Sequence, residues 1–160
     1  MNIFLDEHKK LILQLLGAKV EFILVGGYAV IYHGYGRTTG DMDIWIKPDN
    51  ENKIILSTVL AINGIIQQDL DELIKMDFTR PLAFHLDEAP RRVDFLTHLS
   101  GLNYDEANKM KVFLSIEGKQ VPVLHLDHLI INKLSSNRIK DKADVEELQK
   151  IMRLKKKEQK

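Results

Sequence analysis

Residues 25–46 read Val25-Gly-Gly-Tyr-Ala-Val-Ile-Tyr-His-Gly-Tyr-Gly-Arg-Thr-Thr-Gly-Asp-Met-Asp-Ile-Trp-Ile46. The apolar run Glu21–Val25 predicts a buried strand that ends at Gly26-Gly27. Tyr28–His33 is typical of a short helix, and after a glycine-rich loop Asp41–Ile46 predicts a second strand. This segment therefore indicates two strands joined by a glycine turn, a helix and a loop.

Carboxylates mark the start of the second strand. A strand repeats every two residues, so Asp41 and Asp43 point from the same face, with Cβ atoms about 7 Å apart. Two such carboxylates repel each other unless a counter-charge is present, and Mg²⁺ is the hard cation that oxygen ligands favour. Asp94 lies in another apolar run, Arg91–Leu96. If the two strands are neighbours, three carboxylates could surround two metal ions about 4 Å apart, an arrangement that serves phosphoryl transfer.

The glycine turn supplies the complementary chemistry. Gly26 and Gly27 have no Cβ, so a ligand can approach their backbone N–H groups, and a turn at a helix N-terminus binds phosphate. Arg37 lies in the loop between this turn and the carboxylates. Taken singly, each pattern has a plain structural interpretation, because Gly-Gly is often only a turn and Asp-x-Asp a solvated strand edge. Their combination in this order is much more specific.

The remaining pattern predicts an α/β (α+β) fold. Further helices are expected over Phe4–Leu16, from Pro48-Asp49 to Asn63-Gly64, and over Leu70–Arg80, Leu126–Ser135 and Lys140–Leu154; further strands over Leu82–Leu86, Arg91–Leu96, Val112–Ile116 and Gln120–Leu124. The last two strands read as a hairpin across Glu117-Gly118-Lys119. We expect one domain, residues 1–160, with a mixed sheet of four to six strands flanked by helices. A pair of helices, about 126–155, closes it.

Composition excludes several classes of protein. The 160 residues hold 23 Lys+Arg, 23 Asp+Glu and no cysteine, so disulfide scaffolds, thiolate metal sites and thiol nucleophiles are excluded. The net charge is a cancellation: residues 131–160 hold ten basic and five acidic residues, and residues 1–130 hold 13 and 18. A local basic strip could therefore still guide a nucleotide or an RNA end. No apolar run approaches membrane-spanning length, and the acidic start is unlike a signal peptide, so we expect a cytoplasmic protein without membrane contact. The oligomeric state stays open.

Charged residues interrupt the apolar stripes of the last two helices. Lys133 lies within such a stripe, so it either extends to solvent or meets an anion. Asp141 and Asp144 lie on or beside the next stripe. They either cap the helix and occupy its first turn, or position Lys133 toward a cleft. Tyr28, on the glycine turn, is either a packing residue or a contact for a nucleotide.

The quoted segment, with Arg92–Leu96, Asn132-Lys133 and Lys140-Asp141-Lys-Ala-Asp144, resembles the nucleotidyltransferase superfamily (DNA polymerase β-like fold). The resemblance is greatest to small bacterial members akin to abortive-infection toxin subunits and minimal nucleotidyltransferases. It implies that Asp41, Asp43 and Asp94 are catalytic and bind Mg²⁺ or Mn²⁺. It also implies that Gly26 and Gly27 bind the triphosphate, and that Lys133 binds phosphate with Asp141 as its partner. One departure is Gly27-Tyr28, where the wider superfamily usually has Gly-Ser.

The expected function is metal-dependent transfer of a nucleoside monophosphate from an NTP to a hydroxyl acceptor. That acceptor would be an RNA such as tRNA, a protein or a small molecule. The expected nucleotide-binding residues are Gly26, Gly27, Tyr28, Arg37 and Lys133. The Gly-Tyr departure keeps a second hypothesis open, a non-catalytic nucleotide-binding or toxin–antitoxin partner module on the same fold.

Overall fold

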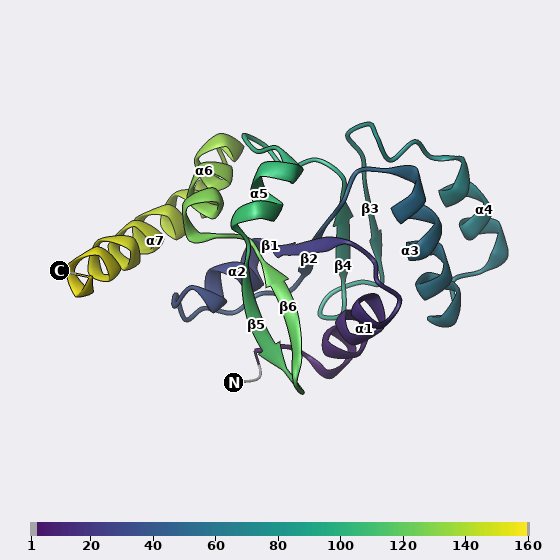
Figure 1. Ribbon diagram of the computed structural model, residues 1–160, viewed down its shortest axis with the longest axis horizontal. Coiled ribbons are helices and arrows are strands. Elements are labelled where there is room, and N and C mark those ends of the chain that lie inside the picture. Colours follow the sequence, from purple (N-terminus) through teal and green to yellow (C-terminus); the bar gives the residue numbers. More distant parts are fainter. Residues whose placement is uncertain (1–2, 160) are drawn as a thin grey trace.

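A computed structural model describes residues 3–159 of the chain; Met1, Asn2 and Lys160, which the expected domain 1–160 includes, lie outside the described residues. Its centre is a six-stranded sheet in the order β3-β4-β2-β1-β6-β5 (Figure 1). The strands are β1 (Phe22–Val25), β2 (Met42–Ile46), β3 (Ala83–Leu86), β4 (Val93–Leu96), β5 (Val112–Ile116) and β6 (Lys119–Val123). Parallel pairs β1–β6 and β2–β4 alternate with antiparallel pairs, which confirms the predicted mixed sheet.

The described helices flank this sheet. They are α1 (Asp6–Gly17), α2 (Gly26–Tyr32), α3 (Asn50–Ile62), α4 (Gln67–Lys75), α5 (Tyr104–Met110), α6 (Leu126–Ser136) and α7 (Ile139–Glu158). The sequence prediction placed α4 a few residues too late and missed α5 altogether. A signal for α5 was present, because Asn103 at the N-cap accepts a hydrogen bond from the backbone N–H of Glu106. Asn-x-x-Glu is a pattern typical of a helix start.

The central strands form the floor of one hydrophobic core. All four residues of β1 are buried, and Trp45 of β2 is 1% exposed, with Nε1 donating to the carbonyl oxygen of Thr97 over 3.2 Å. The predicted hairpin between β5 and β6 is confirmed. Its two turn residues, Glu117 and Gly118, have φ of 50° and 76°, as a tight two-residue hairpin turn requires.

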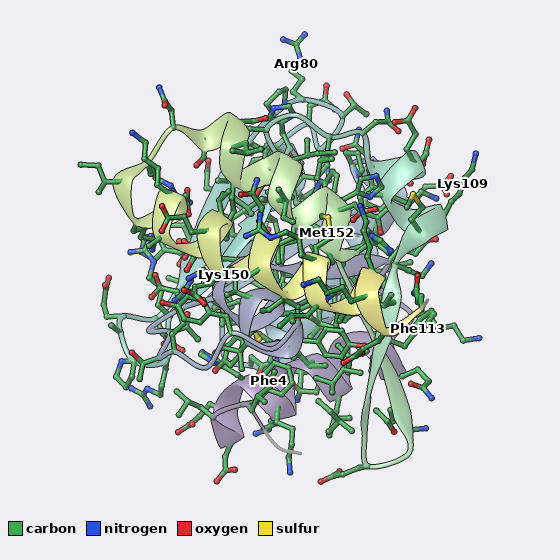
Figure 2. The ribbon with its side chains drawn as sticks, turned by 90° about the vertical axis from the view of Figure 1, so that its left-hand side faces the viewer. Phe4, Arg80, Lys109, Phe113, Lys150 and Met152 are labelled. Atoms are coloured by element: carbon green, nitrogen blue, oxygen red, sulfur yellow. The ribbon has the colours of Figure 1, made fainter. Side chains whose placement is uncertain are left out.

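The C-terminal helix α7 begins against the body of the protein and then extends away from it (Figure 1). Its buried residues, Asp141, Asp144, Val145 and Leu148, lie in its first half, and its last turns are exposed. Figure 2 looks onto this helix, which crosses the front of the molecule with Lys150 and Met152 labelled on it. Within residues 3–159, no helix has the length and apolar character needed to cross a membrane.

Candidate active site

Strand register brings two of the predicted metal ligands together. β2 and β4 are parallel neighbours in which Asp43 is the register partner of Asp94, and Val25 of β1 is the partner of Asp43 on the other side. The two aspartate-bearing strands are thus neighbours, which is the condition under which the three carboxylates could come together. Asp41 lies one residue before β2 begins, because that strand runs from Met42. Its separation of two residues from Asp43 still places both on one face of the sheet.

The glycines of the turn are required by close packing. Gly26 has φ of 64°, a left-handed conformation that favours glycine. A Cβ at Gly26 would overlap the carboxyl group of Asp43, with only 2.9 Å to its Cβ, and a Cβ at Gly27 would overlap the side chain of Thr39. The turn therefore lies directly against Asp43 and the loop before β2. Thr39 in turn donates from Oγ1 to the carbonyl oxygen of Asp41 over 3.0 Å.

A cavity of about 710 Å³ opens in front of these groups. It is lined by most of the predicted site residues, namely Gly26, Gly27, Arg37, Asp41, Asp43, Asp94 and Lys133, and by three further cations, Arg92, Arg138 and Lys140. The sequence prediction assigned no role to those three cations. For Arg92, the sequence did contain a signal of its place in the cavity. It precedes Asp94 by two residues in an extended segment, so the two side chains share one face.

Tyr28 is not part of this cavity. Its side chain is 2% exposed and packs against Phe4, with ring centroids 4.6 Å apart. Its hydroxyl lies 2.8 Å from Nδ1 of the buried His8. The structure places this ring in the core, which is the packing role that the sequence also allowed.

Burial and charge act together on Asp43. Burial, together with the charges of Asp94 and Asp41, raises the pKa of the Asp43 carboxyl to about 6, against the opposing charges of Lys140 and Lys133. Negative charge at this point of the cavity is therefore only partly compensated by the protein. A bound cation would complete the compensation.

Asp94 has a counter-ion of its own. Nε of Arg92 lies 3.2 Å from each carboxylate oxygen of Asp94, and Nη2 lies 3.0 Å from Oδ1. As the side chains stand, no three His, Asp or Glu residues within 3–159 form a group that could hold a metal ion. The donor chemistry nevertheless fits a hard divalent cation, because Asp41 and Asp43 offer carboxylate oxygens to the same cavity and neither has an ion pair with a described residue.

Lys133 is buried between two carboxylates of α7. Its Nζ lies 2.9 Å from Asp141 Oδ1 and 2.9 Å from Asp144 Oδ2, and all three side chains are at most 4% exposed. Asp141 also accepts hydrogen bonds from Ser136 and Arg138. Burial alone would raise the pKa of Asp141, but the hydrogen bonds from Ser136 and Lys133 outweigh it and lower this pKa to about 2. The expected pairing of Lys133 with Asp141 is therefore confirmed.

The alternative in which Asp141 caps the helix is not what the structure has. The N-cap of α7 is Arg138, without a side-chain cap hydrogen bond, and Asp141 lies within the first turn. Asp144 has a second role, because Nε of Arg37 lies 3.0 Å from its Oδ1. Asp144 thus joins the loop before β2 to the buried lysine of α6.

Lys140 differs from the other cations of the cavity. Arg37, Arg92, Arg138 and Lys133 each have a carboxylate partner, whereas Lys140 is exposed and has no ion pair with any residue of the described chain. It lines the cavity, and its charge acts on Asp43. Lys140 is therefore the cation most available to a ligand.

Comparison with known proteins bears on the fold. No family model matches the chain, and no curated protein matches it either. Among solved structures, it is similar to a candidate nucleotidyltransferase from Thermotoga maritima, with a TM-score of 0.57, 16% sequence identity and 88% of each chain covered. It is also similar to the lincosamide antibiotic adenylyltransferase LnuA with lincomycin bound, with a TM-score of 0.59, 18% identity, and coverage of 94% of this chain and 99% of that one. The chain has a nucleotidyltransferase-like fold, as its sequence indicated.

Proposed function

We propose that this chain is a nucleotidyltransferase that transfers a nucleoside monophosphate from an NTP to a hydroxyl group, with Mg²⁺ or Mn²⁺. The observation that carries the proposal is the cavity in which Asp41, Asp43 and Asp94 face a glycine turn and a set of cations. Carboxylates for a metal, together with backbone N–H groups and cations for phosphate, are what phosphoryl transfer requires. The similarity in fold to nucleotidyltransferases agrees with this proposal.

Each group of residues has a distinct task. Asp41 and Asp43 would hold the divalent cation, which supplies positive charge to the phosphate oxygens during transfer. The N–H groups of Gly26 and Gly27 would bind the outer phosphates. Lys140 would neutralise them, since it lines the same cavity and has no carboxylate partner within residues 3–159. Lys133, by contrast, is buried between two carboxylates, so it would influence a ligand through its charge.

The proposed reaction exchanges one phosphorus–oxygen bond for another. The acceptor hydroxyl oxygen bonds to the α-phosphorus, the bond from that phosphorus to the bridging oxygen of the β-phosphate breaks, and diphosphate leaves with both electrons of that bond. Asp94 would accept the hydroxyl proton. A carboxylate has about four lone-pair positions, and Arg92 makes three contacts with them, so one position on Oδ2 stays open to the acceptor.

We infer a small molecule as the acceptor. The cavity of about 710 Å³ is of the size that encloses small ligands. LnuA, which has a similar fold, is an adenylyltransferase of lincosamide antibiotics. RNA and protein remain the alternative acceptors, and the experiment below includes both.

The test is incubation with α-³²P-labelled NTPs and Mg²⁺ or Mn²⁺, with panels of small hydroxyl compounds, tRNA and proteins. We expect label on an acceptor with the wild type and none with Asp41→Ala/Asp43→Ala. The matched control is Asp87→Asn, an exposed residue outside the cavity. Binding of NTP by calorimetry without transfer to any acceptor would favour the non-catalytic module, and absence of binding at millimolar NTP and Mg²⁺ would refute both.

Lys140 gives this proposal a second test. Removing one charge-assisted contact costs about 1.5–3 kcal/mol, so Lys140→Ala is expected to weaken NTP binding about 10- to 100-fold. Lys142→Ala is the matched control, because Lys142 is exposed on the same helix and does not line the cavity. Equal affinities of the two variants would remove Lys140 from the phosphate site.

A further inference from the structure

Arg92 and Asp94 form an ion pair inside the candidate active site. They lie two residues apart, Arg92 directly before β4 and Asp94 within it, and both line the cavity. The guanidinium contacts both oxygens of the carboxylate at 3.0–3.2 Å, with side chains 35% and 20% exposed. A two-pronged contact between arginine and a carboxylate is among the strongest hydrogen-bonded ion pairs in proteins.

This pair occupies the oxygens that a second metal ion would need. Two-metal sites hold their cations about 3.5–4 Å apart, with a carboxylate shared between them. Asp94 is the register partner of Asp43, so a second cation beside the first would draw on its oxygens. Three of its roughly four lone-pair positions already accept hydrogen bonds from Arg92.

We propose that the guanidinium of Arg92 takes the place of the second cation, so that the site binds one divalent cation, held by Asp41 and Asp43. This inference rests on the proposed function and concerns the same site. Arginine keeps its positive charge throughout the physiological pH range. Arg92 is therefore a positioning residue that holds Asp94 and supplies a fixed charge on that side of the cavity.

The contrast with the other two carboxylates supports this assignment. Asp41 and Asp43 have no ion pair with any residue in the part of the chain that the structure describes, whereas Asp94 has one. Asp43 and Asp41 are thus available to an external cation without breaking a contact. Asp94 would first have to give up Arg92.

The experiment counts Mn²⁺ by electron paramagnetic resonance, with α,β-methylene-ATP present in amounts equal to the protein. Two Mn²⁺ ions about 4 Å apart couple magnetically and alter the spectrum, so the readout does not depend on activity. We expect one uncoupled Mn²⁺ per wild-type chain and a coupled pair in Arg92→Gln. Arg91→Gln is the matched control, because Arg91 is exposed and lies outside this cavity. Arg92→Lys, which keeps the charge, is expected to bind one ion.

The possible spectra distinguish failure of the Arg92 assignment from failure of the proposed function. A coupled pair in the wild type, or a single ion in a folded Arg92→Gln protein, overturns the assignment of Arg92 and leaves the proposed function in place. No Mn²⁺ on either protein, with or without the nucleotide analogue, overturns the proposed function as well. If Arg92→Gln is unfolded by circular dichroism, the wild-type spectrum alone decides, since a single uncoupled ion supports the assignment and a coupled pair refutes it.

Discussion

Replacing Asp43 by asparagine is expected to stabilise the metal-free protein while it abolishes cation binding. The Asp43 carboxyl has a pKa of about 6, against 3.8 for an ordinary aspartate, because of burial and the neighbouring Asp94 and Asp41. A difference of this size corresponds to about 3 kcal/mol. At pH 8 the carboxyl is ionised in both folded and unfolded chains, so the folded state bears this full cost, which the neutral amide of similar shape avoids.

The sign of the pH dependence follows from the raised pKa. Below about pH 3 the carboxyl is protonated in both states and costs almost nothing, and the cost grows as the pH rises through 4 to 6. The stability gain of Asp43→Asn should therefore be about 3 kcal/mol at pH 8 and about half of that at pH 5. Asp141 contributes in the opposite direction, since its pKa is lowered to about 2. The difference between variant and wild type isolates Asp43 from that contribution.

The measurement is urea unfolding at pH 8 and pH 5, with EDTA and again with millimolar Mg²⁺. Asp87→Asn is the matched control, because it removes the same charge from an exposed loop position and should change stability by less than about 0.5 kcal/mol. We expect Mg²⁺ to stabilise the wild type and the control but not Asp43→Asn. If Asp43→Asn is no more stable than the wild type at pH 8 in EDTA, uncompensated negative charge at this site is the wrong explanation.

Two further substitutions test the scaffold of the site. Lys133→Ala removes the buried cation that Asp141 and Asp144 share. Each aspartate keeps one arginine, Arg138 or Arg37, so the expected cost in urea unfolding is about 3 kcal/mol, the lower end for a broken buried ion pair. Lys150→Ala, on the exposed side of α7, should cost almost nothing, and a loss below about 1 kcal/mol for Lys133→Ala would contradict a structural role for Lys133. Gly26→Ala combines a positive φ with overlap of the Asp43 side chain, and it is expected to lower the free energy of unfolding by about 2–4 kcal/mol. Gly36→Ala, where a Cβ meets open space, should change it little. Equal melting temperatures of the two variants would show that the turn adapts.

Much of the fold could be predicted because its signals are local. β1 is a continuous apolar run ended by Gly26-Gly27, β2 is mostly apolar and is followed by Lys47-Pro48, and the β5–β6 hairpin has its turn sequence at the required place. The helix α5 escaped prediction because Tyr104–Met110 is short and mostly polar, with only Tyr104 and Ala107 buried. Its start was marked by a capping pattern rather than by periodicity.

The candidate site was predictable in its carboxylates and less so in its cations. Asp41 and Asp43 follow from strand periodicity, and the turn that lies against them is marked by Gly26-Gly27. The partners of each cation depend instead on contacts between distant segments, such as Arg37 with Asp144, 107 residues away. Spacing along the chain carries no information about such a pair. The two roles open to Tyr28 could not be separated from the sequence for a related reason, since its direction is set by contact with His8 and Phe4 of the N-terminal segment.

These pairings separate the charges that build the cavity from those that remain for a ligand. Lys133, Arg37 and Asp144 tie α6, α7 and the loop before β2 together, and their charges largely satisfy one another. Asp41, Asp43 and Lys140 face the same cavity and have no such partner in the part of the chain that the structure describes. The raised pKa of Asp43 corresponds to a cost that the fold bears for this. A protein selected for stability alone would neutralise that carboxylate, since buried charge without a partner is unfavourable. Its retention beside Lys140, which has no ion pair among the described residues, is what the proposed ligand would explain, since an NTP with its divalent metal carries both a cation and phosphate.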